Sequence, residues 1–341
     1  MKRIDNPPNP FASYDCEYFG GAVPPARLEV YEDATRQILS RNDSPDIGFR
    51  WSVNPYRGCV HACAYCYARP THEYLGFGAG TDFETRIVVK MNAAKLLRES
   101  FLKESWKGER IVFSGDTDCY QPLEAGYELT RLLLEVCLEF GNPAGIITKS
   151  FLILRDLDLL KKIHERTRLW VSISIPFADE TTARQIEPHA SAISKRFEAV
   201  QRLSEAGIST GVLIAPIIPG LNDSDIPILL KKAAECGAQF ASPVLLRLPG
   251  NVKDVFLSRI KTLFPLAYKK IIGRIRQVRK GELYQSEFGK RFQGEGPYWE
   301  NIQKIFRIYC DKWGLNRQTQ ELPRDPFRRP SLQEEFAFSR D

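Results

Sequence analysis

The sequence predicts an α/β fold in which six strand–helix units form a partial, TIM-like (β/α)6 barrel. Short apolar runs alternate with segments of helical periodicity from about residue 50 to residue 252. Strict alternation of this kind is typical of a parallel sheet with helices outside it, and right-handed crossovers repeated along the sheet curl it toward an open barrel. Polar residues also gather where each apolar run ends, which is where active sites of such folds lie.

The elements follow in order along the chain. The expected strands cover residues 51–54, 110–114, 145–148, 169–175, 208–215 and 240–246. The expected helices cover residues 92–105, 123–140, 154–166, 191–206 and 223–236, and a further helix begins near Val252. Gly207 and Gly237 follow two of these helices directly and provide stop signals.

Three regions are expected. Residues 1–45 are polar and contain prolines, and we predict an N-terminal arm draped on the barrel. Residues 46–265 form the barrel. Residues 266–341 form a C-terminal extension with a basic segment, a final helix over residues 298–313 and a charged tail from Arg317.

Composition indicates a globular protein. The chain has 341 residues, of which 43% are hydrophobic and 26% charged, enough apolar material for a large core. Its first eight residues contain no apolar run, so we expect no secretory signal, and eight cysteines then fit a reducing compartment. The most apolar stretch, residues 207–221, is too short and too rich in proline to cross a membrane. We therefore expect a cytoplasmic monomer with no membrane partner.

The strongest local signal follows the first strand, where Cys59, Cys63 and Cys66 have the spacing CxxxCxxC. Three thiolates in one short loop suit an iron–sulfur cluster or zinc. A structural zinc site needs four ligands, and no further cysteine accompanies this loop in sequence. A zinc knuckle completed by His61 or His72 remains an alternative, which would make the protein a non-catalytic zinc-binding module.

The motifs around these cysteines resemble a known family. The spacing CxxxCxxC with Tyr65 before the last cysteine resembles the radical S-adenosylmethionine (SAM) superfamily. The stretches 54–59 (NPYRGC), 66–74 (CYARPTHEY) and 117–122 (TDCYQP) resemble a functionally unassigned bacterial branch related to spore photoproduct lyase. The resemblance runs from about residue 40 to about residue 313.

This resemblance implies a cofactor pair and a reaction. Cys59, Cys63 and Cys66 would bind a [4Fe–4S] cluster, and its open iron would bind SAM. One-electron reduction would cleave SAM to a 5′-deoxyadenosyl radical that abstracts a hydrogen atom from an unidentified substrate. A flavodoxin or ferredoxin is the implied electron donor, and the reaction is expected to be lyase-like.

Other candidate cofactor-binding residues lie at the later strand ends. Asp116, Thr117 and Asp118 can accept an ammonium group, and the resemblance assigns that segment to the amino group of SAM; a solvated turn is the alternative. Lys149 is expected to pair with a carboxylate, unless it is a surface lysine. Ser172 and Ser174 share one face of a strand and could reach the ribose, or could bond to backbone instead.

Further residues complete the predicted site. Arg196, on the helix after Glu187-Pro188, resembles the carboxylate-binding arginine of the superfamily, with a surface ion pair as the alternative. Tyr65 is expected to stack near adenine. Arg247, after the sixth strand, is expected to face substrate or cofactor. Cys119 is a candidate catalytic hydrogen-atom donor, although the donor cysteine of spore photoproduct lyase precedes the matching Asp, and a buried inert thiol is the alternative.

Two interpretations remain open for the basic stretch 268–293. It combines eight Lys and Arg residues with Tyr284, Phe288 and Phe292. Cations interleaved with aromatic rings can follow a phosphate backbone and stack on bases, and a DNA-repair lyase resembling spore photoproduct lyase is therefore an alternative function. The other interpretation is a solvated helix that covers the open side of the barrel. The net charge of +6 fits both.

Overall fold

The computed structural model describes residues 27–113, 115–317 and 327–330. Its strands are β1 (Glu29–Glu32), β2 (Leu39–Arg41), β3 (Trp51–Val53), β4 (Tyr56–Arg57), β5 (Arg86–Val89), β6 (Ile111–Phe113), β7 (Ala144–Thr148), β8 (Leu169–Ser174), β9 (Ser209–Ile217) and β10 (Phe240–Leu245). Its α-helices are α1 (Thr81–Thr85), α2 (Ala93–Leu102), α3 (Glu124–Tyr127), α4 (Leu129–Phe140), α5 (Leu157–Arg166), α6 (Glu180–Ile186), α7 (Ile193–Glu205), α8 (Ile226–Glu235), α9 (Val252–Leu263), α10 (Tyr268–Gln277) and α11 (Pro297–Trp313). Short 3-10 turns are η1 (Arg69–Leu75), η2 (Phe151–Asp156) and η3 (Asp223–Asp225).

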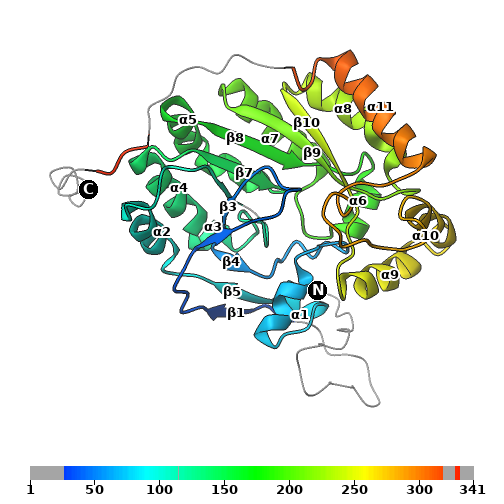
Figure 1. Ribbon diagram of the computed structural model, residues 1–341, viewed down its shortest axis with the longest axis horizontal. Helices are drawn as coiled ribbons and strands as arrows, with labels where there is room; N and C mark the ends of the chain where they lie inside the picture. Colours follow the sequence, from blue (N-terminus) through cyan, green and yellow to red (C-terminus); the bar gives the residue numbers. More distant parts are fainter. Residues whose placement is uncertain (1–26, 114, 318–326, 331–341) are drawn as a thin grey trace.

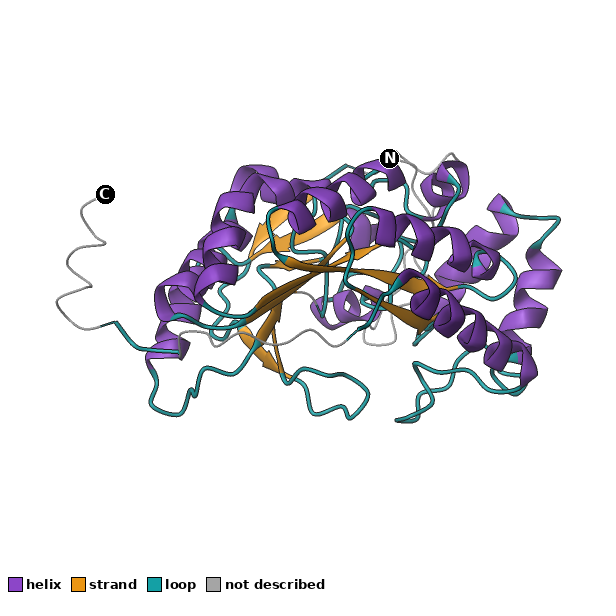
Figure 2. Ribbon diagram, turned by 90° about the horizontal axis from the view of Figure 1, so that it is seen from above, coloured by secondary structure: helices purple, strands orange, loops and turns teal. Residues whose placement is uncertain are grey.

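The main sheet confirms the predicted partial barrel. In the described ranges it has seven strands in the order β10-β9-β8-β7-β6-β3-β2. Strands β3, β6, β7, β8, β9 and β10 run parallel, and they are the six predicted strands. Strand β2 adds an antiparallel edge to β3. The sheet curves without closing, and helices cover its outer face (Figures 1 and 2).

Each predicted helical segment contains a helix, and one of these segments is interrupted, whereas α1 and α6 were not predicted. The predicted helix over residues 123–140 is divided into α3 and α4 at Glu128, which has a positive φ of 52°. The buried carboxylate of Glu124 accepts a hydrogen bond from the backbone N–H of Thr130 at 3.0 Å, so it serves the start of α4. Gly207 and Gly237, with φ near +80°, follow α7 and α8 as predicted.

A second, smaller sheet joins segments that the sequence analysis treated separately. It has the order β1-β5-β4, and β1 pairs in parallel with β5. Strands β1 and β2 thus place part of the predicted arm in regular structure. Residues 1–26 of that arm lie outside the described residues, as do residues 318–326 and 331–341 of the predicted tail.

The inner face of the sheet carries aromatic rings that lie over glycines of the neighbouring strand. Gly145 is paired with Trp170, and Gly211 with Phe240. A Cβ atom at either glycine would stand 2.3–2.4 Å from the neighbouring ring, so only glycine lets these rings lie flat against the sheet. The two rings contact each other edge to face at 6.5 Å between centroids and form the floor of the barrel interior.

The C-terminal extension contains α10 and the predicted final helix, α11. Arg279, one of the basic residues expected to face nucleic acid or solvent, is fully buried. Its guanidinium donates hydrogen bonds of 2.7–3.0 Å to the carbonyls of Leu246, Lys290, Arg291 and Gln293. It therefore fastens the extension to the end of β10. In the described part of the chain, none of the helices has the length and hydropathy needed to span a membrane.

Candidate functional site

A cavity of about 1060 Å³ lies along the inner face of the sheet and is lined by residues from both ends of the strands, including those that follow their carboxyl ends. The three cysteines of the CxxxCxxC loop line it. So do most of the other predicted site residues, namely Tyr65, Asp116, Thr117, Asp118, Lys149, Ser172, Ser174 and Arg247. The strand ends therefore bring together residues that are spread over nearly 190 positions of the sequence.

The cysteine loop is held from behind by two arginines. Arg69 is fully buried and donates to the carbonyl of Cys63 at 2.7 Å and to the carbonyls of Ala79 and Gly80 at 2.9 and 3.0 Å. Arg259, from α9, donates to the carbonyl of Ala62 at 2.6 Å. Both guanidinium groups also pair with the buried carboxylate of Glu84. One carboxylate thus fixes two cations that together hold the backbone of the loop.

The turn that enters this loop requires glycine. Gly58 has a φ of +77°, and a Cβ atom there would lie 2.8 Å from the ring of His72 and 3.0 Å from the carbonyl oxygen of Phe83. That same carbonyl accepts a hydrogen bond from the N–H of Cys59 at 2.9 Å. The loop backbone is therefore fixed by packing before any ligand binds.

The three cysteines form no disulfide, and Cys59 and Cys63 are buried while Cys66 is half-buried. Burial raises the pKa of all three thiols, that of Cys63 to about 12, and the charges of Asp118 and Glu187 add to the effect at Cys59 and Cys63, respectively. Buried thiols become stable thiolates when a metal centre supplies compensating positive charge. The donor set of three thiols in one corner of a cavity fits an iron–sulfur cluster.

The same residues fit a single zinc ion less well. Among the described residues, no group of three His, Cys, Asp or Glu side chains is arranged to hold one metal ion. His72 turns away from the cavity and bonds through Nε2 to the carbonyl of Arg86 at 2.7 Å. His61 lines the cavity but faces Asp118. In a cubane cluster each thiolate binds a different iron, so the sulfurs need not converge on one point.

Two of the three predicted residues after β6, Thr117 and Asp118, are held by hydrogen bonds within the protein. The carboxylate of Asp118 accepts hydrogen bonds from Thr148 Oγ1, Lys149 N and Tyr120 N at 2.6–2.9 Å. Although burial acts to raise the pKa of Asp118, His61 and these donors hold it well below its ordinary value. Thr117 is similarly engaged, since its hydroxyl lies 3.1 Å from Oδ1 of Asn54.

The carboxylate of Asp116 accepts fewer hydrogen bonds than that of Asp118, so it has more free acceptor positions for a ligand. It is half-buried, lines the cavity and accepts one side-chain hydrogen bond, from Thr71 at 2.8 Å. Burial raises the pKa of its carboxyl. A carboxylate in this setting is favoured by a cation that arrives with a ligand. Asp116 is therefore the member of the predicted trio best placed to accept an ammonium group.

Arg196 lies behind the cavity wall. It is buried, pairs with Glu187 at 2.6 Å and donates to the carbonyls of Ser191 and Ser174 at 2.7 and 3.1 Å. It is absent from the cavity lining. Glu187 in turn accepts a hydrogen bond from the hydroxyl of Tyr65. The guanidinium thus orients Glu187 and, through it, the ring of Tyr65. A role of Arg196 toward a cofactor carboxylate stays a prediction.

Lys149 is the cation that reaches the cavity beside Tyr65, with Nζ 5.6 Å from the ring centroid. Burial acts to lower its pKa, but the charges of Cys63 and Glu187 outweigh burial and raise it. Ser172 and Ser174 also line the cavity, whereas Ile173 between them points into the core, as the alternation of a strand predicts.

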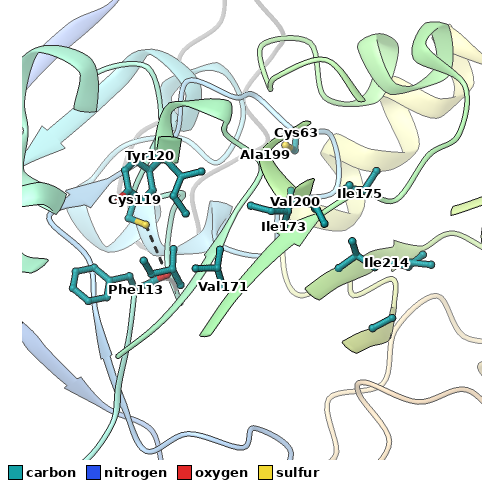
Figure 3. Close-up of a cluster of buried hydrophobic side chains, with 14 of the residues drawn as sticks. Cys63, Phe113, Cys119, Tyr120, Val171, Ile173, Ile175, Ala199, Val200 and Ile214 are labelled. Carbon is teal, nitrogen blue, oxygen red and sulfur yellow. Dashed lines mark hydrogen bonds between the residues drawn. The ribbon is translucent and has the colours of Figure 1, made fainter. Parts of the chain in front are cut away.

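Cys119 does not reach this site. Its side chain is fully buried, and Sγ donates to the carbonyl of Phe113 at 3.8 Å. Figure 3 shows it among Phe113, Tyr120 and Val171, with Cys63 in a separate part of the view. Because Cys119 is not part of the cavity lining, its position matches the alternative of a buried inert thiol.

One segment that sequence reasoning missed, the loop 42–49, lines the cavity together with Phe292 of the basic stretch 268–293. The loop and the stretch are joined where Asp46 pairs with Arg291 at 2.7 Å and accepts the N–H of Gly289 at 2.6 Å. This contact supports the interpretation that the basic extension covers the open side. The joined residues lie more than 240 positions apart, so no local pattern could indicate it.

Comparison with known proteins agrees with this geometry. A family model described as the radical SAM superfamily matches residues 53–233. An uncharacterized protein of Mycobacterium tuberculosis is 35% identical over 236 residues, which cover 68% of each chain. A protein of a Pseudomonas phage called radical SAM Nα-GlyT isomerase is 26% identical over 188 residues, 54% of this chain and 37% of its own.

Solved structures show the same fold at low identity. Spore photoproduct lyase complexed with dinucleoside spore photoproduct has a TM-score of 0.58 and 17% identity, covering 84% of this chain and 80% of that chain. A variant of that lyase with bound AdoMet and the same dinucleoside also has a TM-score of 0.58, at 18% identity.

We expect Glu84→Gln to destabilise the protein by about 3–5 kcal/mol, because it leaves two buried guanidinium groups without their shared anion. Urea unfolding measures this change. Glu99→Gln is the matched control, because its exposed pair with Lys95 contributes about 0.5 kcal/mol or less. If Glu84→Gln lies within about 0.5 kcal/mol of the wild type, the loop is held by other contacts.

His72 makes stability depend on pH. Burial lowers its pKa to about 4 from an ordinary value of 6.5, so between these values the unfolded chain binds a proton that the folded chain excludes. Stability from this group is complete above pH 6.5 and declines as the pH falls toward 4, by up to about 1.4 kcal/mol per pH unit. His72→Gln removes the titration, and urea unfolding from pH 7 to pH 4 should therefore show a smaller slope; equal slopes would contradict the assignment.

Proposed function

Because the chain belongs to the radical SAM superfamily, we propose that it is an enzyme that binds a [4Fe–4S] cluster through Cys59, Cys63 and Cys66 and reductively cleaves SAM. The observation that carries this proposal is the set of three thiols grouped on one fixed loop at the mouth of a large cavity. When bound, the cluster would supply one electron to SAM, which would break its C–S bond to give methionine and a 5′-deoxyadenosyl radical able to abstract a substrate hydrogen atom.

The residues of the cavity each have a proposed task toward SAM. Asp116 accepts the ammonium of its methionine part, since its carboxylate lines the cavity and accepts one side-chain hydrogen bond where that of Asp118 accepts three hydrogen bonds. Lys149, the cation beside Tyr65, pairs with the carboxylate of SAM. Ser172 and Ser174 face the ribose. Tyr65, Ala215 and Pro216 give the adenine an apolar surface. The fixed backbone of the loop orients the three thiols and Tyr65 before SAM arrives, and the strand ends position the other groups, so little reorganisation accompanies binding.

The proposal extends to the surroundings of the enzyme. A reduced flavodoxin or ferredoxin serves as electron donor, and the protein acts in the cytoplasm. The chain then consists of an arm (residues 1–45), a barrel (residues 46–265) and a C-terminal extension (residues 266–341), and the extension covers the open side of the barrel.

A DNA-repair lyase is the second candidate. The fold of spore photoproduct lyase and the exposed Lys269 and Lys270 on α10 favour it. The position of Cys119 in the core weighs against a hydrogen-donating thiol at that residue. Salt-dependent binding of single-stranded DNA that is lost in Lys269→Gln/Lys270→Gln would support this candidate. Arg279 should be left intact in that test because it fastens the extension.

We expect the anaerobically reconstituted, dithionite-reduced protein to form 5′-deoxyadenosine from SAM, measured by chromatography. Cys63→Ala should abolish the product, because one cluster ligand is lost. The control is Cys236→Ala, because Cys236 is a half-buried thiol outside the cavity, and it should leave product formation unchanged. Protein that takes up zinc, but neither iron nor acid-labile sulfide, would instead support the interpretation as a zinc-binding module.

A further inference from the structure

Arg247 lies just after β10 and, like Lys149, lines the cavity. Its guanidinium carbon lies 5.3 Å from the ring centroid of Tyr67 and 4.4 Å from that of Phe292. Tyr67 directly follows the ligand Cys66, and Phe292 belongs to the segment that covers the open side. The cation is therefore placed at the mouth of the cavity, next to the cysteine loop.

This cation has no anionic partner in the described part of the chain. Its Nε is buried without a hydrogen-bond acceptor, and no ion pair or hydrogen bond engages the rest of the guanidinium there. Its neighbour Arg279 is also positive: burial lowers the pKa of Arg279 to about 10, and the charge of Arg247 acts in the same direction. A half-buried guanidinium in such a place is costly unless an anion joins it.

The aromatic neighbours leave its hydrogen-bonding edge available. Rings contact a guanidinium through its face, whereas its N–H groups point outward in its plane and form a fork that matches a carboxylate or phosphate. Unlike Arg69, Arg196 and Arg279, whose N–H groups are bound by carbonyls and carboxylates, Arg247 keeps this fork for a ligand.

The cavity is large for a single ligand. Its volume of about 1060 Å³ lies at the top of the range of about 300–1,000 Å³ for pockets that hold one drug-sized ligand. Lys149, next to Cys63 and Tyr65, already offers a cation for the carboxylate of SAM. The cation of Arg247, which lies beside Tyr67 and not beside Tyr65, therefore remains for the substrate.

We propose that Arg247 binds an oxyanion of the substrate, a carboxylate or a phosphate, while Tyr67 and Phe292 hold its side chain in place. This deepens the proposed function and rests on it in one respect, namely that a substrate enters the cavity together with SAM. It restricts the unidentified substrate to molecules that carry such a group within reach of the radical.

The test uses the reconstituted full-length chain and its thermal unfolding in sodium phosphate and in sodium malonate, against sodium chloride at equal ionic strength. A ligand that binds the folded chain raises the unfolding temperature with concentration, which gives an apparent Kd. We expect one of the two anions to stabilise the wild type, and the choice between them identifies the group as phosphate or carboxylate. Arg247→Gln should weaken this binding about 10-fold or more, the usual weight of a charge-assisted pair.

Two further variants sharpen the result. Arg247→Lys keeps the charge but not the fork and should bind with intermediate affinity. Arg276→Gln removes an exposed arginine of α10 whose side chain has no hydrogen bond or ion pair in the described structure, and it should bind the anion like the wild type. In chloride alone, Arg247→Gln should unfold at the same temperature as the wild type or higher, because it removes an unpaired charge.

Three outcomes would overturn the proposal. In the first, Arg247→Gln responds to both anions like the wild type, or neither anion stabilises the wild type. In the second, Arg276→Gln loses the response equally, which indicates general surface charge. In the third, equilibrium dialysis shows that Arg247→Gln weakens the binding of SAM, relative to the wild type, by the same factor as it weakens the binding of the anion. The cation would then serve the cofactor. None of these measurements requires SAM cleavage, so a failure of the proposed reaction would be seen separately.

Discussion

The carboxylate of Glu84, shared by the buried guanidinium groups of Arg69 and Arg259, is the contact on which the site depends. Each arginine also donates to a carbonyl of the cysteine loop, at Cys63 and at Ala62. The charges would be costly to bury separately, and they are tolerated because one anion and several carbonyls satisfy them together. A loop of three cysteines is thereby held in one conformation at the end of β3, next to the other strand ends.

Much of the fold could be predicted because its signals are local. Apolar runs and helical periodicity indicate the six parallel strands and the helices between them, and right-handed crossovers leave few topologies. The small sheet β1-β5-β4 was not predicted, since pairing between β1 and β5 joins residues more than 50 positions apart. The break at Glu128 and the contact of Asp46 with Arg291 also depend on partners that the local sequence does not specify.

The candidate site shows the same division. The cysteines and the residues after each strand could be predicted because carboxyl ends of parallel strands share one edge. What each polar side chain does there depends on its partners. Arg196 forms an ion pair with Glu187, and Asp118 accepts hydrogen bonds from three donors, so both side chains stabilise the walls of the cavity. By contrast, Asp116, Lys149 and Arg247 have fewer hydrogen-bond partners and can still bind a ligand. Cys119 follows Asp118 directly, yet one step along a turn is enough to direct its thiol into the core.

The central claim is that the three thiolates leave one iron of the cluster open for SAM. The most direct measurement is the electron paramagnetic resonance spectrum of the reduced, reconstituted protein before and after SAM is added. The account predicts a [4Fe–4S] signal whose g-values shift when SAM binds, as expected when the ligands of one iron change. A cluster signal that SAM leaves unaltered, or protein that binds no cluster with all three cysteines intact, would contradict it.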